Sequence, residues 1–235
     1  MLGTRKLDPE LDTGKVLDSI EKAAYLAVKS YGFKRHGRTL HRFVSGDISQ
    51  VINFQLGQSY LGETHLLFVN VGIRVPECMT RSFRPEEKTK TYYRENECNI
   101  RSFLGTVEGK ERSCYDLRQS CDMIIADILR QIQTCVIPAF EALNSRDAIL
   151  ARRRQYPQFD LLNNHLILLE ESMIYGRRGE AEKAAETLNL YYHLFSSGKL
   201  AQKDRRAIES HMRYINGLAA ELGINITQTN SDKRR

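Results

Sequence analysis

The 235-residue chain has no tryptophan and only five prolines, and its cysteines are odd in number. The five cysteines are Cys78, Cys98, Cys114, Cys121 and Cys135, and no two of them have C-x-x-C spacing. This argues against a zinc knuckle, a thioredoxin-type redox motif and a disulfide framework. The six histidines also lack the i, i+4 spacing of a helical metal site. We therefore expect no metal ligands and no cofactor.

Targeting and membrane segments are also missing from the pattern. Residues 1–12 are charged and have no apolar core, so we expect no signal peptide. No apolar run approaches the roughly 20 residues that a membrane helix needs. Together with the cysteine usage, this predicts a soluble cytoplasmic protein that does not bind a membrane.

The charge balance excludes fewer classes of protein than the cysteine pattern does. Lys and Arg number 35 against 29 Asp and Glu, which gives a net charge of +6, and the basic residues lie in small scattered groups. Solvated faces explain such groups, whereas a nucleic-acid surface needs several of them to converge in space. The residues that could contact phosphates in that case are Lys34, Arg35, Arg38, Arg152, Arg153 and Arg154.

What the chain does have is a hydrophobic fraction of 41%, enough for a core, arranged in clear periodic segments. A helical apolar stripe over residues 13–30 precedes a series of segments with the alternation of strands. Four strands are predicted, over residues 38–44, 48–56, 64–75 and 98–107. A long helix is predicted over residues 113–144, with Pro138 expected to kink or restart it. The order predicts an α+β fold, in which a four-stranded antiparallel sheet packs on the N-terminal helix and the long helix.

The pattern changes beyond residue 150. Three helices are predicted there, over residues 159–175, 179–195 and 201–222, separated by Gly-containing breaks. We interpret residues 1–150 as the sheet domain and residues 151–235 as a helical extension.

Carboxamides lie inside two of the predicted strands, where packing alone does not ask for them. If Gly46-Asp47 forms the first turn and strands two and three pair as a hairpin, Asn53, Gln55 and Asn70 share one face of the sheet. Arg42 or Arg101 joins them, depending on the register. Such amides can donate and accept hydrogen bonds toward a peptide, an extended strand or a base edge. The alternatives are a solvated face, or amides satisfied beneath the C-terminal helices.

One triplet, Glu108-Gly109-Lys110, has the acid-x-Lys form found in some metal-dependent nucleases. Such an enzyme needs a second carboxylate on a neighbouring strand to hold its metal. Strands two and three offer none, so we interpret the triplet as a turn and expect no catalytic residues.

Several short segments, in this order, resemble the bacterial domain-of-unknown-function 4304 family over residues 10–150. They are GFKRHGR (32–38), QVINFQ (50–55), FVNVGI (68–73), CNIR (98–101) with LG (104–105), and VIP (136–138). The chain departs from the family where tryptophan is expected before the long helix and Tyr115 stands instead. The resemblance implies the fold and a bacterial cytoplasmic module, and it implies no activity.

These observations lead to one functional hypothesis and one alternative. The first is a non-catalytic cytoplasmic protein-binding module, of immunity or antitoxin type, that contacts a protein partner such as a toxin. It would use the sheet face or the groove between sheet and extension, through Arg42, Asn53, Gln55, Asn70 and Arg101. The alternative is a nucleic-acid-associated protein that uses the basic residues named above.

Overall fold

A computed structural model describes residues 12–57, 65–78, 90–109, 114–159, 166–196 and 205–226. The chain forms two compact units. The first comprises residues 1–74 and 91–161 and contains the sheet; the second comprises residues 75–90 and 162–235 and is helical where it is described.

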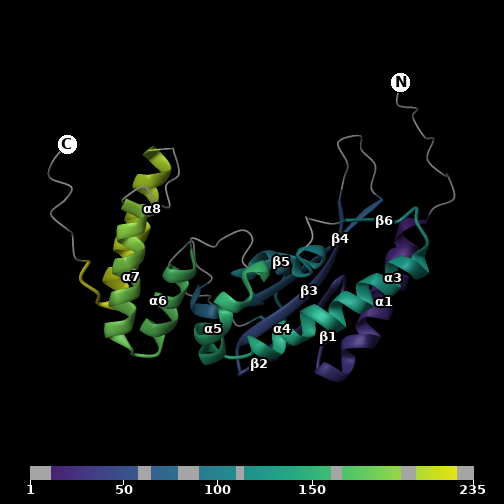
Figure 1. The fold of residues 1–235 in the computed structure, drawn as a ribbon, viewed down its shortest axis with the longest axis horizontal. Helices are drawn as coiled ribbons and strands as arrows, with labels where there is room; N and C mark the ends of the chain where they lie inside the picture. The colour runs from purple at the N-terminus through teal and green to yellow at the C-terminus, as the bar shows by residue number, and fades with distance from the viewer. Residues whose placement is uncertain are drawn as a thin grey trace. The chain divides into compact units, whose positions relative to one another are not determined.

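The first unit is built on an antiparallel sheet (Figure 1). Its strands are β1 (Lys34–His36), β2 (Thr39–Val44), β3 (Ile48–Gly57), β4 (Leu66–Arg74), β5 (Ile100–Phe103) and β6 (Tyr115–Asp116). The spatial order is β1-β2-β3-β4-β5, and β6 pairs with Leu66 and Leu67 at the start of β4. The α+β fold with an antiparallel sheet is therefore confirmed, and the count of four strands is wrong.

The two missed strands are short and lack apolar alternation. All three residues of β1 are exposed, and β6 has only two residues. The strand predicted over residues 98–107 is in fact β5 followed by the helical turn α2 (Leu104–Val107). Gly37, at φ 54°, opens a two-residue loop that joins β1 to β2. A glycine at this first loop position fits the II′ turn that closes tight hairpins.

One face of the sheet, which we call face B, is covered by helices (Figure 1). They are α1 (Thr13–Val28) and a continuous stretch made of α3 (Cys121–Gln131), the π-helical turn η4 (Ile132–Val136) and α4 (Ile137–Ala142). The π turn ends at Val136, two residues before Pro138, near the point where the sequence predicted an interruption. The predicted long helix begins later than residue 113, because β6 precedes it.

The core lies between face B and these helices. Strands and helices alike contribute side chains that are at most 2% exposed: Leu17, Ile20, Ala24, Leu40, Ile48, Ile52, Phe54, Val71, Ile73, Ile124, Ile128 and Phe140. Each of the Leu, Ile, Val and Phe side chains contributes about 1.5–3 kcal/mol by leaving water. Helix α5 (Arg146–Arg152) follows the long helical stretch, with Ser145 accepting a hydrogen bond from the Ala148 N–H as its N-cap.

Among the described residues, one helical stretch, Cys121–Ala142, is long and apolar enough to cross a membrane by length and composition, with 44% of its most apolar window buried. The core helix of a soluble protein passes the same test, so this is weak support for a membrane span. The expectation from the sequence, that no apolar run approaches the length of a membrane helix, therefore has one exception in this helical stretch.

The second unit contains α6 (Ile167–Arg177), α7 (Ala181–Ser196) and α8 (Arg205–Leu222), together with the short η2 (Pro76–Cys78). Its interior includes Leu169, Ile174, Leu188, Tyr191 and Ile215. At the contact with α8, a Cβ on Gly176 would lie 2.6 Å from a methyl carbon of Leu222, so glycine permits the close approach. These helices correspond to the three predicted for the extension; residues 160–165 and 201–204, which were also predicted as helical, lie outside the described residues.

Candidate functional site

The amides predicted to share a surface do so. We call their side of the sheet face A, opposite the helix-covered face B. Asn53 of β3 pairs directly with Asn70 of β4, and Gln55 follows two residues later on the same face. We call these three residues the amide cluster. They belong to a row that crosses the sheet at one level, composed of His36, Thr39, Asn53, Asn70 and Phe103.

The amide cluster is connected by hydrogen bonds. The Asn70 Nδ2 donates to Gln55 Oε1 at 3.0 Å and to Asn53 Oδ1 at 3.4 Å. The Asn53 Nδ2 donates in turn to Thr39 Oγ1 at 3.0 Å. Asn70 is only 2% exposed, Asn53 is half-buried and Gln55 is exposed. The buried Asn70 therefore holds the carboxamide of the exposed Gln55 in place.

The two arginines expected near the amides lie on different faces. Arg101 pairs with Gly72 and so shares face A, where its Nε donates to Glu95 Oε1 at 2.5 Å. Arg42 pairs with Gln50 and lies on face B, only 8% exposed. The structure thus brings Arg101, but not Arg42, to the face of the amide cluster.

Arg42 instead joins the sheet to its helices. Its guanidinium donates to Gln50 Oε1 at 2.7 Å, to the Tyr31 carbonyl at 2.8 Å and to Glu141 Oε1 at 2.6 Å. Gln50, fully buried, donates to the Phe140 carbonyl at 2.6 Å. The sequence reasoning missed Gln50, although a carboxamide within the apolar alternation of Ile48 and Ile52 was a signal for a buried polar contact.

Part of face A is covered by residues 91–99. The Tyr92 ring stacks on His36 with centroids 3.6 Å apart, and the Arg74 guanidinium carbon lies 3.7 Å from the centre of the Tyr93 ring. Cys98 takes the space above Gly72. This segment covers the side of the face that lies away from Gln55.

His41 lies beneath this covering segment, 5% exposed and 5.9 Å from the Tyr92 ring. Its Nδ1 has no hydrogen-bond partner among the described residues. Burial lowers the pKa of His41, and the nearby His36 and Lys34 lower it further. These surroundings therefore favour the neutral form of the imidazole.

The basic residues of the nucleic-acid alternative come from two elements. Lys34, Arg35 and Arg38 belong to the exposed β1–β2 hairpin, where Arg35 Nε donates to Glu21 Oε1 at 2.6 Å. Arg152 ends α5, and Arg153, only 1% exposed, begins with Arg154 the 3-10 turn η5 (Arg153–Gln155) that follows. Arg35 and Arg153 are thus engaged within the fold.

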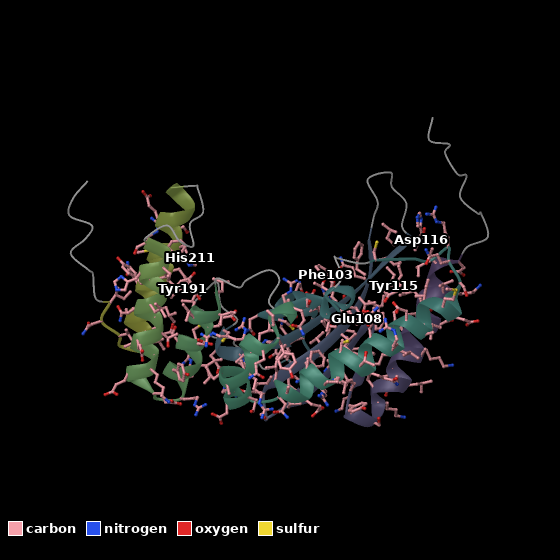
Figure 2. All side chains as sticks on the ribbon, viewed as in Figure 1. Phe103, Glu108, Tyr115, Asp116, Tyr191 and His211 are labelled. Atoms are coloured by element: carbon pink, nitrogen blue, oxygen red, sulfur yellow. The ribbon has the colours of Figure 1, made fainter. Side chains whose placement is uncertain are left out.

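A second polar cluster was not expected from the sequence (Figure 2). Arg130 of α3 forms ion pairs with Glu108 and, at 2.5 Å, with Asp127. The Tyr115 hydroxyl donates to Asp127 Oδ2 at 2.9 Å, and Gln131 Nε2 donates to that hydroxyl at 2.9 Å. Burial and the neighbouring Asp127 raise the pKa of Tyr115. The i, i+3, i+4 spacing of Asp127, Arg130 and Gln131 was the available signal.

This cluster joins β6 and the end of α2 to α3. Glu108 caps α2 and is paired with Arg130, in keeping with the interpretation of its segment as a turn; Lys110 lies outside the described residues. In the described part of the chain, no group of three or more His, Cys, Asp or Glu residues is arranged to hold a metal.

The helical unit has its own aromatic cluster (Figure 2). The Tyr191 hydroxyl of α7 lies 2.6 Å from His211 Nε2 of α8, and Phe195 lies 4.5 Å from the same imidazole between ring centroids. Burial raises the pKa of Tyr191. This contact joins two helices of one unit.

Comparison with known proteins identifies a family but no characterised relative. Residues 26–142 match the model of a family described as a domain of unknown function, DUF4304. No curated protein and no solved structure matches the chain.

Proposed function

Residues 26–142 belong to the DUF4304 family, whose description names no activity. The function must therefore be inferred from the residues of the site, and we propose that the chain is a non-catalytic protein-binding module. In this proposal, a partner protein contacts face A at the amide cluster. An immunity or antitoxin-like role in a bacterial cytoplasm is the concrete form of the proposal.

The observation that carries the proposal is the fixed and exposed carboxamide of Gln55. Its Oε1 accepts from the buried Asn70, while its Nε2 has no hydrogen-bond partner among the described residues. A primary amide matches the donor and acceptor pattern of a peptide group. Holding it in place before binding lowers the entropy cost of recognition. Arg101 of the same face adds a charged group at the neighbouring level of the sheet.

A site-specific crosslink tests the proposal without knowledge of the partner. A photoreactive amino acid replaces Gln55 in the native host, and the matched control carries it at Gln133, an exposed carboxamide on the helical stretch over face B. We expect one protein to be crosslinked from position 55 and not from position 133. The absence of a protein crosslink at 55, or the same products from both positions, would contradict the proposal.

Once a crosslinked protein is identified, its affinity provides the second test. Gln55→Ala should weaken binding by about tenfold, equivalent to the ~1.4 kcal/mol of one good hydrogen bond. Gln133→Ala should leave the affinity unchanged. If the partner is a toxin encoded beside this chain, the immunity-type role gains support; a partner of another kind removes it.

The nucleic-acid alternative has less support. Of its six basic residues, Arg35 is paired with Glu21 and Arg153 is buried. Phosphate contacts also make affinity fall steeply with salt. Binding to a nucleic acid with a flat salt response would therefore count against this alternative.

A further inference from the structure

The strand β1 forms one edge of the sheet. It pairs with β2 on one side, and no described strand pairs with its other side. All three of its residues, Lys34, Arg35 and His36, are exposed, as are Gly37 and Arg38 of the following loop. An edge strand presents backbone donors and acceptors that another strand can use.

The hydrogen-bond alternation shows which backbone groups of β1 point outward. The Phe54 N–H donates to the Arg38 carbonyl at 2.9 Å, so the even-numbered residues of β2 direct their backbone groups toward β3. Leu40 is one of these, and it is the partner of Arg35. Arg35 therefore receives no ladder bond from β2, and its N–H and C=O face the open edge.

The charges on this edge select the kind of strand that can be added. Lys34 and His36 lie on face A, while Arg35 lies on face B, with its guanidinium held by the buried carboxylate of Glu21. Two copies of β1 paired through this edge would place Arg35 opposite its own copy, and like charges directly opposite destabilise a sheet. The charges thus disfavour self-pairing and favour an acidic partner.

We propose that the open edge of β1 binds an extended segment of a partner protein that carries carboxylates at alternate positions. The residue opposite Arg35 forms the backbone hydrogen bonds, and its side chain lies on face B beside the Arg35–Glu21 pair. That side chain is uncharged, since an acid there would face Glu21. The residues before and after it lie opposite Lys34 and His36 on face A, and they carry the carboxylates.

A short synthetic peptide tests this directly. The probe is acetyl-Thr-Glu-Val-Glu-Thr-amide at millimolar concentration, added to the full chain, with acetyl-Thr-Lys-Val-Lys-Thr-amide as the control. We expect the acidic probe alone to shift the Arg35 amide resonance and to slow its hydrogen exchange, by about tenfold when the peptide is at ten times its Kd. If the acidic probe leaves the Arg35 amide unperturbed, or if both probes act alike, the proposal is wrong.

A proline at position 35 separates strand addition from simple charge attraction. Arg35→Pro removes an N–H that the β1–β2 ladder does not use, and edge strands accept proline at such positions. Because Glu21 would lose its ion pair, Glu21→Gln accompanies the change, and the matched control is Glu21→Gln with Arg35→Thr. The proline variant should lose probe binding and the threonine variant should keep it. Binding by the proline variant would overturn the proposal, as would concentration-dependent self-association of the natural chain through β1.

This proposal does not depend on the amide cluster. Gln55 lies on β3, two strands away from β1 in the order of the sheet. Gln55→Ala should leave probe binding at β1 unchanged. Failure at one of the two surfaces can therefore be told apart from failure at the other.

Discussion

Cys98 lies directly over Gly72 on face A: a Cβ placed on Gly72 would come within 2.7 Å of the Cys98 Cβ and 2.8 Å of its sulfur. Real Cβ atoms essentially never approach so closely, and both residues are in packed positions. A glycine inside a strand often marks a close approach of another chain segment or a ligand. Here the space is filled by the chain's own residues 91–99.

Gly72→Ala should therefore destabilise the chain by about 1–3 kcal/mol, because the covering segment must move away from β4. Urea unfolding measures the change. Adding Cys98→Gly should recover part of the loss, which appears as a coupling energy in the double-mutant cycle. Gly14→Ala, where the nearest atom is Oδ1 of the exposed N-cap residue Asp12 at 3.2 Å, is the matched control and should cause a smaller loss than the change at Gly72. Strict additivity of the two changes at face A would contradict the contact.

Substitutions at Asn70 and at Gln55 should differ in their effect on stability, because only Asn70 is buried. Asn70→Ala removes the buried donor that both Asn53 and Gln55 accept from, and we expect a loss of about 1–3 kcal/mol in the free energy of unfolding. Gln55→Ala changes an exposed side chain and should stay within about 0.5 kcal/mol of the natural chain. Chemical denaturation checks both. Equal losses would mean that the two amides are equally buried in solution.

Arg42 should act on stability alone. Arg42→Met leaves the Gln50 oxygen and the Tyr31 carbonyl without their donor inside the fold, so a loss of about 2 kcal/mol is expected, discounted because Glu141 is half exposed. The control is Arg118→Met, which breaks a pair with Asp116 at the surface and should cost at most about 1 kcal/mol. Partner affinity measured on folded Arg42→Met should match that of the natural chain.

His41 should make stability depend on pH. Its pKa is lowered in the folded state, so its contribution is fully present above the unfolded value of about 6.5 and is lost as pH falls through the lower folded pKa. Between pH 7 and pH 5 the unfolding midpoint should therefore fall, and His41→Phe should flatten that slope. Lys34→Ser removes one of the neighbouring charges and should flatten it in part. An unchanged slope in His41→Phe would show that other groups are responsible.

The central strands were predictable because apolar residues alternate along β3 and β4, and that alternation also placed Asn53, Gln55 and Asn70 on one face. The strands β1 and β6 were not, since three exposed polar residues and a two-residue strand carry no such pattern. The covering of face A by Tyr92 and Tyr93 depends on a connection whose path no local rule specifies.

The placement of Arg42 shows how one additional loop residue determines the face of the sheet on which a side chain lies. With Gly46-Asp47 as the turn, the sequence left open whether Arg42 or Arg101 joins the amides; a two-residue turn there would set Arg42 opposite Val51 on the face of Asn53. The loop in fact has three residues, with Ser45 at φ 46° and Gly46 at φ 86°, so Arg42 pairs with Gln50. A slip of one position moves a side chain to the other side of a sheet. Backbone angles of this kind, rare for serine, leave little trace in the sequence.

The π turn at Ile132–Val136 has a consequence for the helix that contains it. It holds one residue more than an α turn, so everything after it is rotated by about 100° relative to an unbroken helix. That offset brings the Phe140 carbonyl to Gln50 and the Glu141 carboxylate to Arg42. Deleting a single residue from the turn would give a more regular helix in which the residues after the turn are rotated away from these positions. Arg42 and Gln50 would then lose their hydrogen bonds to Glu141 and Phe140.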